Sequence, residues 1–199
     1  MTLREKYGEW GIILGATEGV GKAFCERLAK EGMNVVMVGR REEKLKELGE
    51  ELKNTYEIDY KVVKADFSLP DATDKIFAAT ENLDMGFMAY VACLHSFGKI
   101  QDTPWEKHEA MINVNVVTFM KCFYHYMKIF AAQDRGAVIN VSSMTGISSS
   151  PWNGQYGAGK AFILKMTEAV ACETEKTNVD VEVITLGTTL TPSLLSNLP

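Results

Sequence analysis

Tyr156 and Lys160 stand four residues apart in a segment whose pattern predicts a helix. Positions i and i+4 lie on the same helix face, one turn apart, so the two side chains would be neighbours. An ammonium beside a phenol favours the phenolate and lowers its pKa, which suits Tyr156 to acid and base chemistry nearer to neutral pH. Ser143, thirteen residues before Tyr156, could donate a hydrogen bond to a substrate oxygen. Most Tyr-x3-Lys pairs lie on a helix surface without a catalytic role, so this prediction depends on the surrounding elements.

A strand, a loop and a helix must position these residues. The apolar, β-branched run 136–141 predicts a buried strand that leads into Ser142 and Ser143. A loop rich in Ser, Thr and Gly follows, and a helical pattern runs from about residue 155 to residue 176. Further strands are predicted at 10–14, 34–38, 60–65, 86–92 and 179–184, and further helices at 21–30, 41–52, about 68–80 with Ser68 as N-cap, and 105–132.

The alternation of strands and helices indicates an α/β fold. We expect residues 1–199 to form a single dinucleotide-binding domain of Rossmann type, a doubly wound parallel sheet with helices on both faces in three αβα layers. In such sheets, ligands bind at the carboxyl ends of the strands. The candidate residues all fall at such ends.

Composition limits the possible partners. The 199 residues are 46% hydrophobic and 24% charged, with a formal net charge of −5, as is typical of a globular protein. Nucleic-acid binding lacks electrostatic support because there is no long basic run. No window reaches the roughly 18 consecutive apolar residues of a membrane span. The charged N-terminal segment has no apolar signal-peptide core. We expect a cytoplasmic protein that binds neither nucleic acid nor membranes.

The cysteines and histidines show no metal-ligand spacing, so no metal site is expected. The cysteines form no CxxC pair, and we interpret them as reduced thiols that mostly fill the core. They are Cys25, Cys93, Cys122 and Cys172, and the histidines are His95, His108 and His125. His95 follows a predicted strand and could line a site, although a surface or packing role is the more common one.

A glycine-rich turn joins the first predicted strand to the first helix, with Gly15, Gly19 and Gly21. Glycines let the backbone turn tightly and let a pyrophosphate approach the helix N-terminus, where N–H groups point outward. The spacing Gly-x3-Gly-x-Gly differs from the G-x-G-x-x-G of larger dehydrogenases. Its place between strand and helix predicts a dinucleotide site.

The second strand ends in Gly39, Arg40 and Arg41, where an NAD site usually has an acidic residue for the ribose 2′-hydroxyl. Arginine suits a 2′-phosphate because its guanidinium forms paired, charge-assisted hydrogen bonds. We therefore predict NADP(H), although Glu18 adds an unfavourable charge nearby and two surface arginines would also fit this position. Asp66, which ends the third strand, could hold the adenine amino group or form a turn.

The second half of the long helix, residues 119–130, is apolar on most of its circumference. A helix that covers one sheet face needs a single apolar stripe. The excess indicates a second buried face, and we expect it to contact another copy in a homodimer or homotetramer. A deeply buried core helix is the alternative.

The turn Gly15-x3-Gly19-x-Gly21, with Asn115, Ser143, Tyr156 and Lys160 in that order, resembles the short-chain dehydrogenase/reductase superfamily over the whole chain. Segments 3–10, 93–100 and 187–193 are similar to those of the bacterial NADP(H)-dependent 7β-hydroxysteroid dehydrogenases of gut anaerobes. Those enzymes interconvert 7β-hydroxy and 7-oxo bile acids. The resemblance implies the same activity and a steroid or bile-acid substrate.

The resemblance also implies residue roles. Tyr156 would be the general acid and base on the 7-oxygen, and Lys160 would hold the nicotinamide ribose and lower the Tyr156 pKa. Ser143 would hydrogen-bond the reacting oxygen, and Asn115 would complete a proton relay through its backbone and a water. The cofactor-binding residues implied are Gly15, Thr17, Glu18, Gly19, Val20, Gly21, Arg40, Arg41, Asp66, Phe67, Ala92, Thr188 and Thr189, together with Tyr156 and Lys160.

Some positions depart from the family pattern. Leu14 stands where a Thr commonly precedes the first glycine, residues 90–93 replace Asn-Asn-Ala-Gly, and Leu186 replaces a Pro. The sequence stops at Pro199, where the family continues with a substrate-covering segment. We expect the domain either to lack that segment or to belong to a longer enzyme.

There are two alternatives to the bile-acid activity. One is a reductase of another bulky alcohol or ketone, and the other is a non-catalytic NADP(H)-binding protein.

Overall fold

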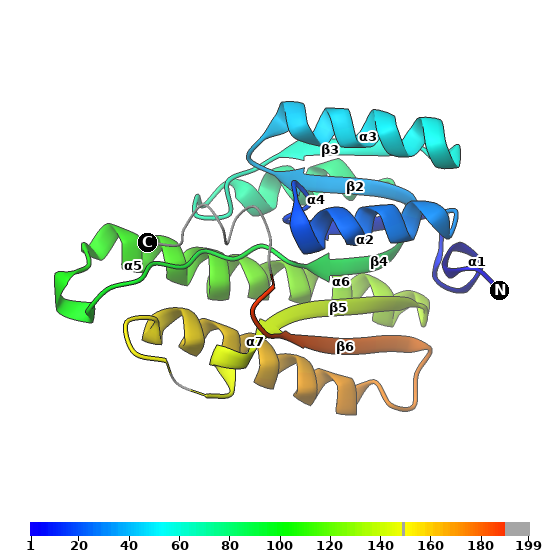
Figure 1. The fold of residues 1–199 in the computed structure, drawn as a ribbon. Helices are drawn as coiled ribbons and strands as arrows, with labels where there is room; N and C mark the ends of the chain where they lie inside the picture. Colours follow the sequence, from blue (N-terminus) through cyan, green and yellow to red (C-terminus); the bar gives the residue numbers. More distant parts are fainter. Residues whose placement is uncertain (149, 190–199) are drawn as a thin grey trace.

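The computed structural model describes residues 1–148 and 150–189, which form a six-stranded parallel sheet flanked by helices (Figure 1). The strands are β1 (Trp10–Leu14), β2 (Asn34–Gly39), β3 (Tyr60–Lys64), β4 (Met85–Tyr90), β5 (Gly136–Ser143) and β6 (Val179–Leu186). Their order across the sheet is β3-β2-β1-β4-β5-β6. The predicted fold class, a doubly wound parallel sheet, is confirmed.

The strand order reverses between β1 and β4. From β1 the chain winds outward to β2 and β3, and it then returns to β4, which pairs with the other side of β1. Leu14 and Tyr90 lie opposite each other near the carboxyl ends of these two strands. Ligands of doubly wound sheets bind at this reversal, in the crevice outside the strand ends.

The helices cover both faces of the sheet. The core consists of two hydrophobic clusters, one on each face of the sheet. Leu28 and Leu45 pack with Ile13 of β1 in one cluster, and Phe119 and Ile163 belong to the other. The first face carries α1 (Leu3–Tyr7), α2 (Gly19–Lys30) and α3 (Glu42–Tyr56), and the second carries α4 (Ala72–Thr80), α6 (Phe119–Gln133) and α7 (Gly154–Glu173). The α5 helix (Trp105–Ile112) and the 3-10 turns η1 (Ile100–Asp102) and η3 (Met144–Gly146) lie in the connections.

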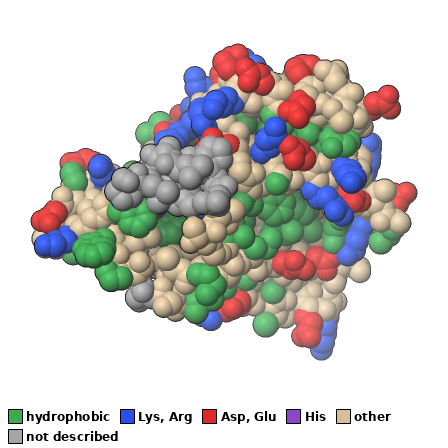
Figure 2. Space-filling view, viewed as in Figure 1, with side chains coloured by type: hydrophobic (Ala, Val, Ile, Leu, Met, Phe, Trp, Pro, Cys, Tyr) green, Lys and Arg blue, Asp and Glu red, His purple; other side chains and the backbone are tan. Residues whose placement is uncertain are grey.

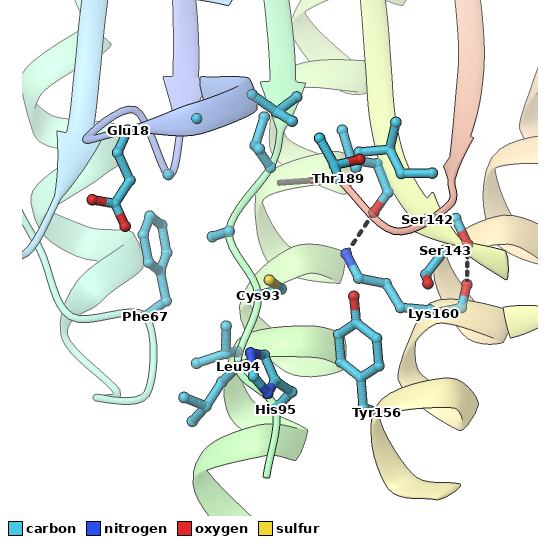
Figure 3. Close-up of a pocket in the computed structure, with 18 of the residues that line it drawn as sticks. Glu18, Phe67, Cys93, Leu94, His95, Ser142, Ser143, Tyr156, Lys160 and Thr189 are labelled. Carbon is cyan, nitrogen blue, oxygen red and sulfur yellow. Dashed lines mark hydrogen bonds between the residues drawn. The ribbon is translucent and has the colours of Figure 1, made fainter. Parts of the chain in front are cut away.

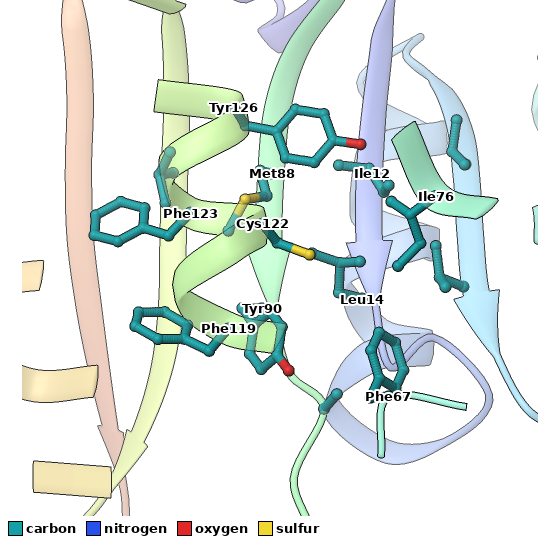
Figure 4. Packing of buried hydrophobic residues seen from close by; sticks show 14 of the residues in the cluster. Ile12, Leu14, Phe67, Ile76, Met88, Tyr90, Phe119, Cys122, Phe123 and Tyr126 are labelled. Carbon is teal, nitrogen blue, oxygen red and sulfur yellow. The ribbon is translucent and has the colours of Figure 1, made fainter. Parts of the chain in front are cut away.

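The core beneath the strand ends is aromatic. Figure 4 shows Phe119 of α6 beside Tyr90 of β4, with Phe123 and Tyr126 further along the same helix. Burial of each large apolar side chain stabilises the fold by about 1.5–3 kcal/mol. The buried Tyr90 hydroxyl donates to the Val114 carbonyl at 2.6 Å. This bond ties the end of β4 to the helix behind it, at a position where the sequence departs from the family pattern.

The predicted helix 105–132 is helical throughout but changes type in the middle. Between α5 and α6, the segment η2 (Asn113–Thr118) is a π-helix. Single π-helical turns inside α-helices occur frequently at functional sites. Here the wider turn contains Asn115, one of the predicted catalytic residues.

The capping box predicted at Ser68 is wrong. The α4 helix begins at Ala72, with Asp71 as its N-cap. The backbone N–H and the hydroxyl of Ser68 both donate to Oδ1 of Asp66, at 3.0 and 2.8 Å. A serine that bonds back to a preceding aspartate forms a local turn, which competes with helix capping.

The molecular surface is mixed. Charged side chains cover the helices, while hydrophobic side chains gather over β4 and β5 on the face that also carries α2 (Figure 2). Among the helices of the described ranges, none has the length and apolar character that crossing a membrane requires. The prediction that the cysteines fill the core holds for Cys25 and Cys122, whereas Cys93 and Cys172 are exposed.

Candidate active site

A cavity of about 470 Å³ opens at the carboxyl ends of the strands, where the strand order reverses (Figure 3). It brings together most of the residues predicted from the sequence. These are Gly15, Thr17, Glu18, Gly19, Val20, Arg40, Arg41, Asp66, Phe67, Ala92, Ser143, Tyr156, Lys160, Thr188 and Thr189. Gly21 and Asn115 do not line the cavity, but each contacts a residue that does.

Tyr156 and Lys160 project from the first turns of α7 toward Ser143 at the end of β5 (Figure 3). The buried Lys160 Nζ donates to the Val141 carbonyl at 2.6 Å and lies 5.8 Å from the centroid of the Tyr156 ring. The Ser142 hydroxyl donates to the Lys160 carbonyl at 2.8 Å. Two bonds to β5 therefore fix the helix turn that carries Lys160.

The Ser143 hydroxyl is oriented by Thr145. Its Oγ accepts hydrogen bonds from the Thr145 N–H at 3.3 Å and from the Thr145 hydroxyl at 3.0 Å. A hydroxyl has one proton and two lone pairs. Because Thr145 uses the lone pairs, the Ser143 proton is left to donate to an oxygen in the cavity.

Burial dominates the acid–base properties of Tyr156 and Lys160. Burial raises the pKa of Tyr156 above its ordinary value of 10.0, Cys93 adds to the rise, and a hydrogen bond with Ser143 opposes it. Burial also lowers the pKa of Lys160. In this arrangement desolvation disfavours both charged forms, and the Lys160 ammonium bonds a carbonyl instead of the phenol. That Lys160 lowers the Tyr156 pKa stays a prediction.

The glycine turn packs more closely than side chains would allow. Gly15 has φ of +99°, and a Cβ there would lie 2.6 Å from the Ala92 nitrogen. A Cβ at Gly21 would lie 2.0 Å from the Gly15 carbonyl oxygen, so Gly21 permits the close contact of helix and turn. The α2 helix begins at Gly19, and its N-cap Glu18 makes no side-chain capping bond. Its first N–H groups are thus available to a phosphate at the cavity.

The arginine pair lies at the far end of the cavity. Arg41 Nη2 forms an ion pair with Glu18 Oε2 at 2.8 Å, which neutralises the charge considered unfavourable from the sequence. Arg40 has no carboxylate within ion-pair distance in the described part of the chain. A Cβ at Gly39 would lie 2.7 Å from Oγ1 of Thr17, so a side chain at the position usually acidic in NAD sites would require Thr17 to move.

Asn115 clamps the segment that follows β4. Its Oδ1 accepts from the Leu94 N–H at 3.0 Å, and its Nδ2 donates to the Leu94 carbonyl at 2.6 Å. Gly159 permits this arrangement, because a Cβ there would lie 2.9 Å from the Asn115 Cβ. The side chain therefore acts on the cavity wall, behind the reacting groups.

Asp66 and the C-terminal threonines occupy the two ends of the cavity. The Asp66 carboxylate holds the turn at Ser68, which is the second of its two predicted roles, and Phe67 lies beside it. Thr188 and Thr189 follow β6, and the Thr189 hydroxyl donates to the Gly187 carbonyl at 3.2 Å.

Several lining residues escaped the sequence analysis. Among them are Cys93, Leu94, Phe97, Met144, Thr145 and Asn153, and His95 was considered but not chosen. Residues 93–97 directly follow β4, and Asn153 precedes Tyr156 by three positions on the same helix face. Residues 93–97 could have been predicted, because every residue that follows a strand end is a candidate in this fold. The role of Asn153 could not, because it depends on burial.

The fold, the glycine turn and the Ser–Tyr–Lys constellation define a class of oxidoreductases, and the chain belongs to the short-chain dehydrogenase family, whose profile matches residues 9–197. As a member of this family it is an enzyme that uses a nicotinamide dinucleotide.

The chain is similar over its full length to particular members of that family. It is 84% identical over 199 residues to the 7β-hydroxysteroid dehydrogenase of Collinsella aerofaciens and 46% identical to that of Clostridium sardiniense, and it spans 76% of each. It superposes with a TM-score of 0.97 on a solved 7β-hydroxysteroid dehydrogenase structure of 84% identity, covering 100% of this chain and 77% of that one.

Proposed function

We propose that this protein interconverts 7β-hydroxy and 7-oxo bile acids, of the ursodeoxycholate and 7-oxolithocholate type, with NADP(H) as cofactor. The observation that carries the proposal is the 84% identity to a 7β-hydroxysteroid dehydrogenase over the whole chain. The cavity joins the Ser143, Tyr156 and Lys160 side chains to a glycine turn and an arginine pair, as such a reaction needs.

The proton chemistry follows from Tyr156. When bound, the nicotinamide supplies a hydride to the ketone carbon, or takes one from the alcohol carbon. In reduction, the Tyr156 phenol gives its proton to the carbonyl oxygen, and Ser143 donates a hydrogen bond to the same oxygen. In oxidation, Tyr156 takes the proton from the hydroxyl. Burial raises the pKa of Tyr156, which favours the protonated phenol that reduction requires as the acid.

The other catalytic residues hold this arrangement. Lys160 would bind the nicotinamide ribose while its bond to Val141 fixes its position. Asn115 would contribute a backbone carbonyl and a water to proton exchange, and its side chain holds Leu94 in the cavity wall. In both cases the buried position restricts the side chain to one orientation.

Preference for NADP(H) rests on the arginine end of the cavity. Arg40 and Arg41 would bind the 2′-phosphate through charge-assisted hydrogen bonds, and Gly39 replaces the acidic residue that would repel this phosphate. The remaining cofactor contacts proposed are the pyrophosphate with Gly15, Thr17, Gly19, Val20 and Gly21, the adenine with Asp66 and Phe67, and the nicotinamide end with Ala92, Thr188 and Thr189.

We further propose a cytoplasmic homodimer or homotetramer. The outer side of η2 and α6 exposes Val117 and Tyr124, with Met120 between them, although the inner side already covers the sheet. A second copy would bury these residues. The described cysteines are all free thiols, which is compatible with a reducing compartment.

The deciding experiment is NADPH oxidation by the full-length protein with 7-oxolithocholic acid, with identification of the product epimer. The proposal requires a 7β-hydroxy product. Ketone reduction without activity on any 7-oxo bile acid would indicate a reductase of another bulky ketone. Saturable NADPH binding without turnover of any ketone would indicate a non-catalytic binding protein.

A further inference from the structure

Two polar side chains in the catalytic cavity have no part in the chemistry described so far. They are His95, on the segment after β4, and Asn153, the N-cap of α7. No side-chain hydrogen bond joins either of them to another described residue. Both therefore offer hydrogen-bonding capacity to whatever enters the cavity.

The His95 ring lies against the catalytic tyrosine. Its centroid is 5.9 Å from that of Tyr156, with the rings at 74°, and 5.5 Å from that of Phe97 (Figure 3). The ring is half-buried, and burial lowers the pKa of His95. A neutral imidazole carries one N–H donor and one nitrogen acceptor. A partner that both donates and accepts would match it.

Asn153 is more deeply buried. Its side chain is 7% exposed, and its Oδ1 has no partner within the described residues. It makes no capping bond to the first turn of α7, although asparagine is a favoured N-cap. Buried amides are nearly always hydrogen-bonded, so an unpaired one on a ligand cavity points to a partner that arrives with the ligand.

Both side chains line the same cavity as Tyr156. Asn153 caps α7 three residues before Tyr156, and Lys160, one turn after Tyr156, is bonded to β5. At the other end, the Gly98 N–H donates to the Trp152 carbonyl at 2.9 Å, which holds the segment after His95 against the start of α7.

We propose that His95 and Asn153 form a subsite for a second hydroxyl group of the steroid, bound while Ser143 and Tyr156 engage the reacting oxygen. The inference rests on the proposed function, since it takes the substrate to be a steroid. A hydroxyl both donates and accepts, so it satisfies either imidazole tautomer and either orientation of the amide. A carboxylate only accepts, and it would be buried there without a cation.

Apolar side chains line the same cavity, which fits a steroid nucleus. They include Leu94, Phe97 and Met144. A site that hydrogen-bonds a substrate hydroxyl rejects the analogue without it, because the site's own polar groups then stay unpaired. His95 and Asn153 would thus select among steroids that share the reacting ketone.

The test measures the reduction of three 7-oxo-5β-cholanoic acids that differ only in their other hydroxyls: none, 3α, or 3α and 12α. Wild type is compared with His95→Phe, Asn153→Leu and the polar replacement His95→Asn. His125→Phe is the matched control, because His125 stacks on Phe77 and lies outside the cavity lining. The affinity for NADPH and the melting temperature show that each variant is folded.

We expect wild type to prefer one hydroxylated ketone by at least about ten-fold in kcat/KM. His95→Phe and Asn153→Leu should reduce this preference to below about three-fold, mainly through KM, and His95→Asn should restore part of it. His125→Phe should leave it unchanged.

The failures of the two proposals are distinguishable. Three results would overturn the subsite and leave the proposed function standing. They are turnover by wild type without any hydroxyl preference, an unchanged preference in both variants, and an equal loss of activity on all three ketones. No turnover of any 7-oxo steroid by wild type would overturn the proposed function, and the subsite with it.

Discussion

Lys160 donates its hydrogen bond to the carbonyl oxygen of Val141, at 2.6 Å, and not to the phenol of Tyr156. Its ammonium lies beside the Tyr156 ring, 5.8 Å from the centroid, in a position that burial makes costly for a charge. The pair thus differs from one in which the ammonium bonds the phenol directly and favours its ionisation. Lys160 is anchored to β5 by this bond, while burial lowers the pKa of Lys160 and raises that of Tyr156.

Replacing Tyr156 with Phe should remove the acid–base group and leave the cavity shape intact. We expect kcat to fall by about 10²–10⁴-fold, the range of general acid–base contributions, with NADPH affinity unchanged. Steady-state kinetics and cofactor titration measure the two effects. Tyr56→Phe, at the end of α3, is the control. Retained turnover in Tyr156→Phe would remove Tyr156 from the mechanism.

The raised pKa of Tyr156 predicts an alkaline titration. In the cofactor-free protein, the tyrosinate absorbance that is lost in Tyr156→Phe should appear above pH 10.0, the ordinary value. The protonated form donates in reduction, so the reduction rate should persist as the pH rises toward that region. Ser143→Ala removes the hydrogen bond that opposes the rise, and should move the titration higher still. A titration below the ordinary value would show that Lys160 controls the phenol after all.

Arg40 and Arg41 should discriminate between the two nicotinamide dinucleotides. Loss of charge-assisted hydrogen bonds of about 1.5–3 kcal/mol should weaken NADPH by about 10–100-fold in Arg40→Ala and leave NADH nearly unchanged. Arg41→Ala should have the smaller effect, because Arg41 is already shared with Glu18 at 2.8 Å. Equilibrium titration with both cofactors measures this, and Lys53→Ala on the far end of α3 is the control. Equal losses for NADPH and NADH would contradict the 2′-phosphate assignment.

The sequence was sufficient for the fold and for most of the residues that line the cavity, because those features are local. The glycine turn between β1 and α2, and the spacing of Tyr156 and Lys160 on one helix, are visible without tertiary contacts. The partner of Lys160 was not, because it depends on how α7 meets β5. The unpaired amide of Asn153 and the turn formed by Ser68 likewise depend on burial and on neighbours that no periodicity reveals.

Two glycines of α7 test how tightly the site is packed. A Cβ at Gly159 would lie 2.9 Å from the Asn115 Cβ, whereas a Cβ at Gly154 would meet nothing within 4 Å. We expect Gly159→Ala to lose about 1–3 kcal/mol of stability through overpacking, and to lower activity by displacing the Leu94 clamp. Gly154→Ala should be neutral, or stabilising by about 0.4–1 kcal/mol. Denaturant unfolding measures both, and equal stabilities would show that the contact with Asn115 relaxes freely.

The outer side of α6 should be an interface between copies. Tyr124 is 60% exposed and Val117 is 39% exposed, on a helix whose opposite side is buried in the core. A charge at the centre of such an apolar contact would remain desolvated and unpaired in the assembly. Tyr124→Glu should therefore convert the oligomer into monomers, as measured by sedimentation velocity, whereas Lys121→Glu, at an exposed position one helical turn away, should change the assembly much less. If the wild-type protein sediments as a monomer over the micromolar range, this face covers nothing in solution, and the exposure of Val117 and Tyr124 needs another explanation.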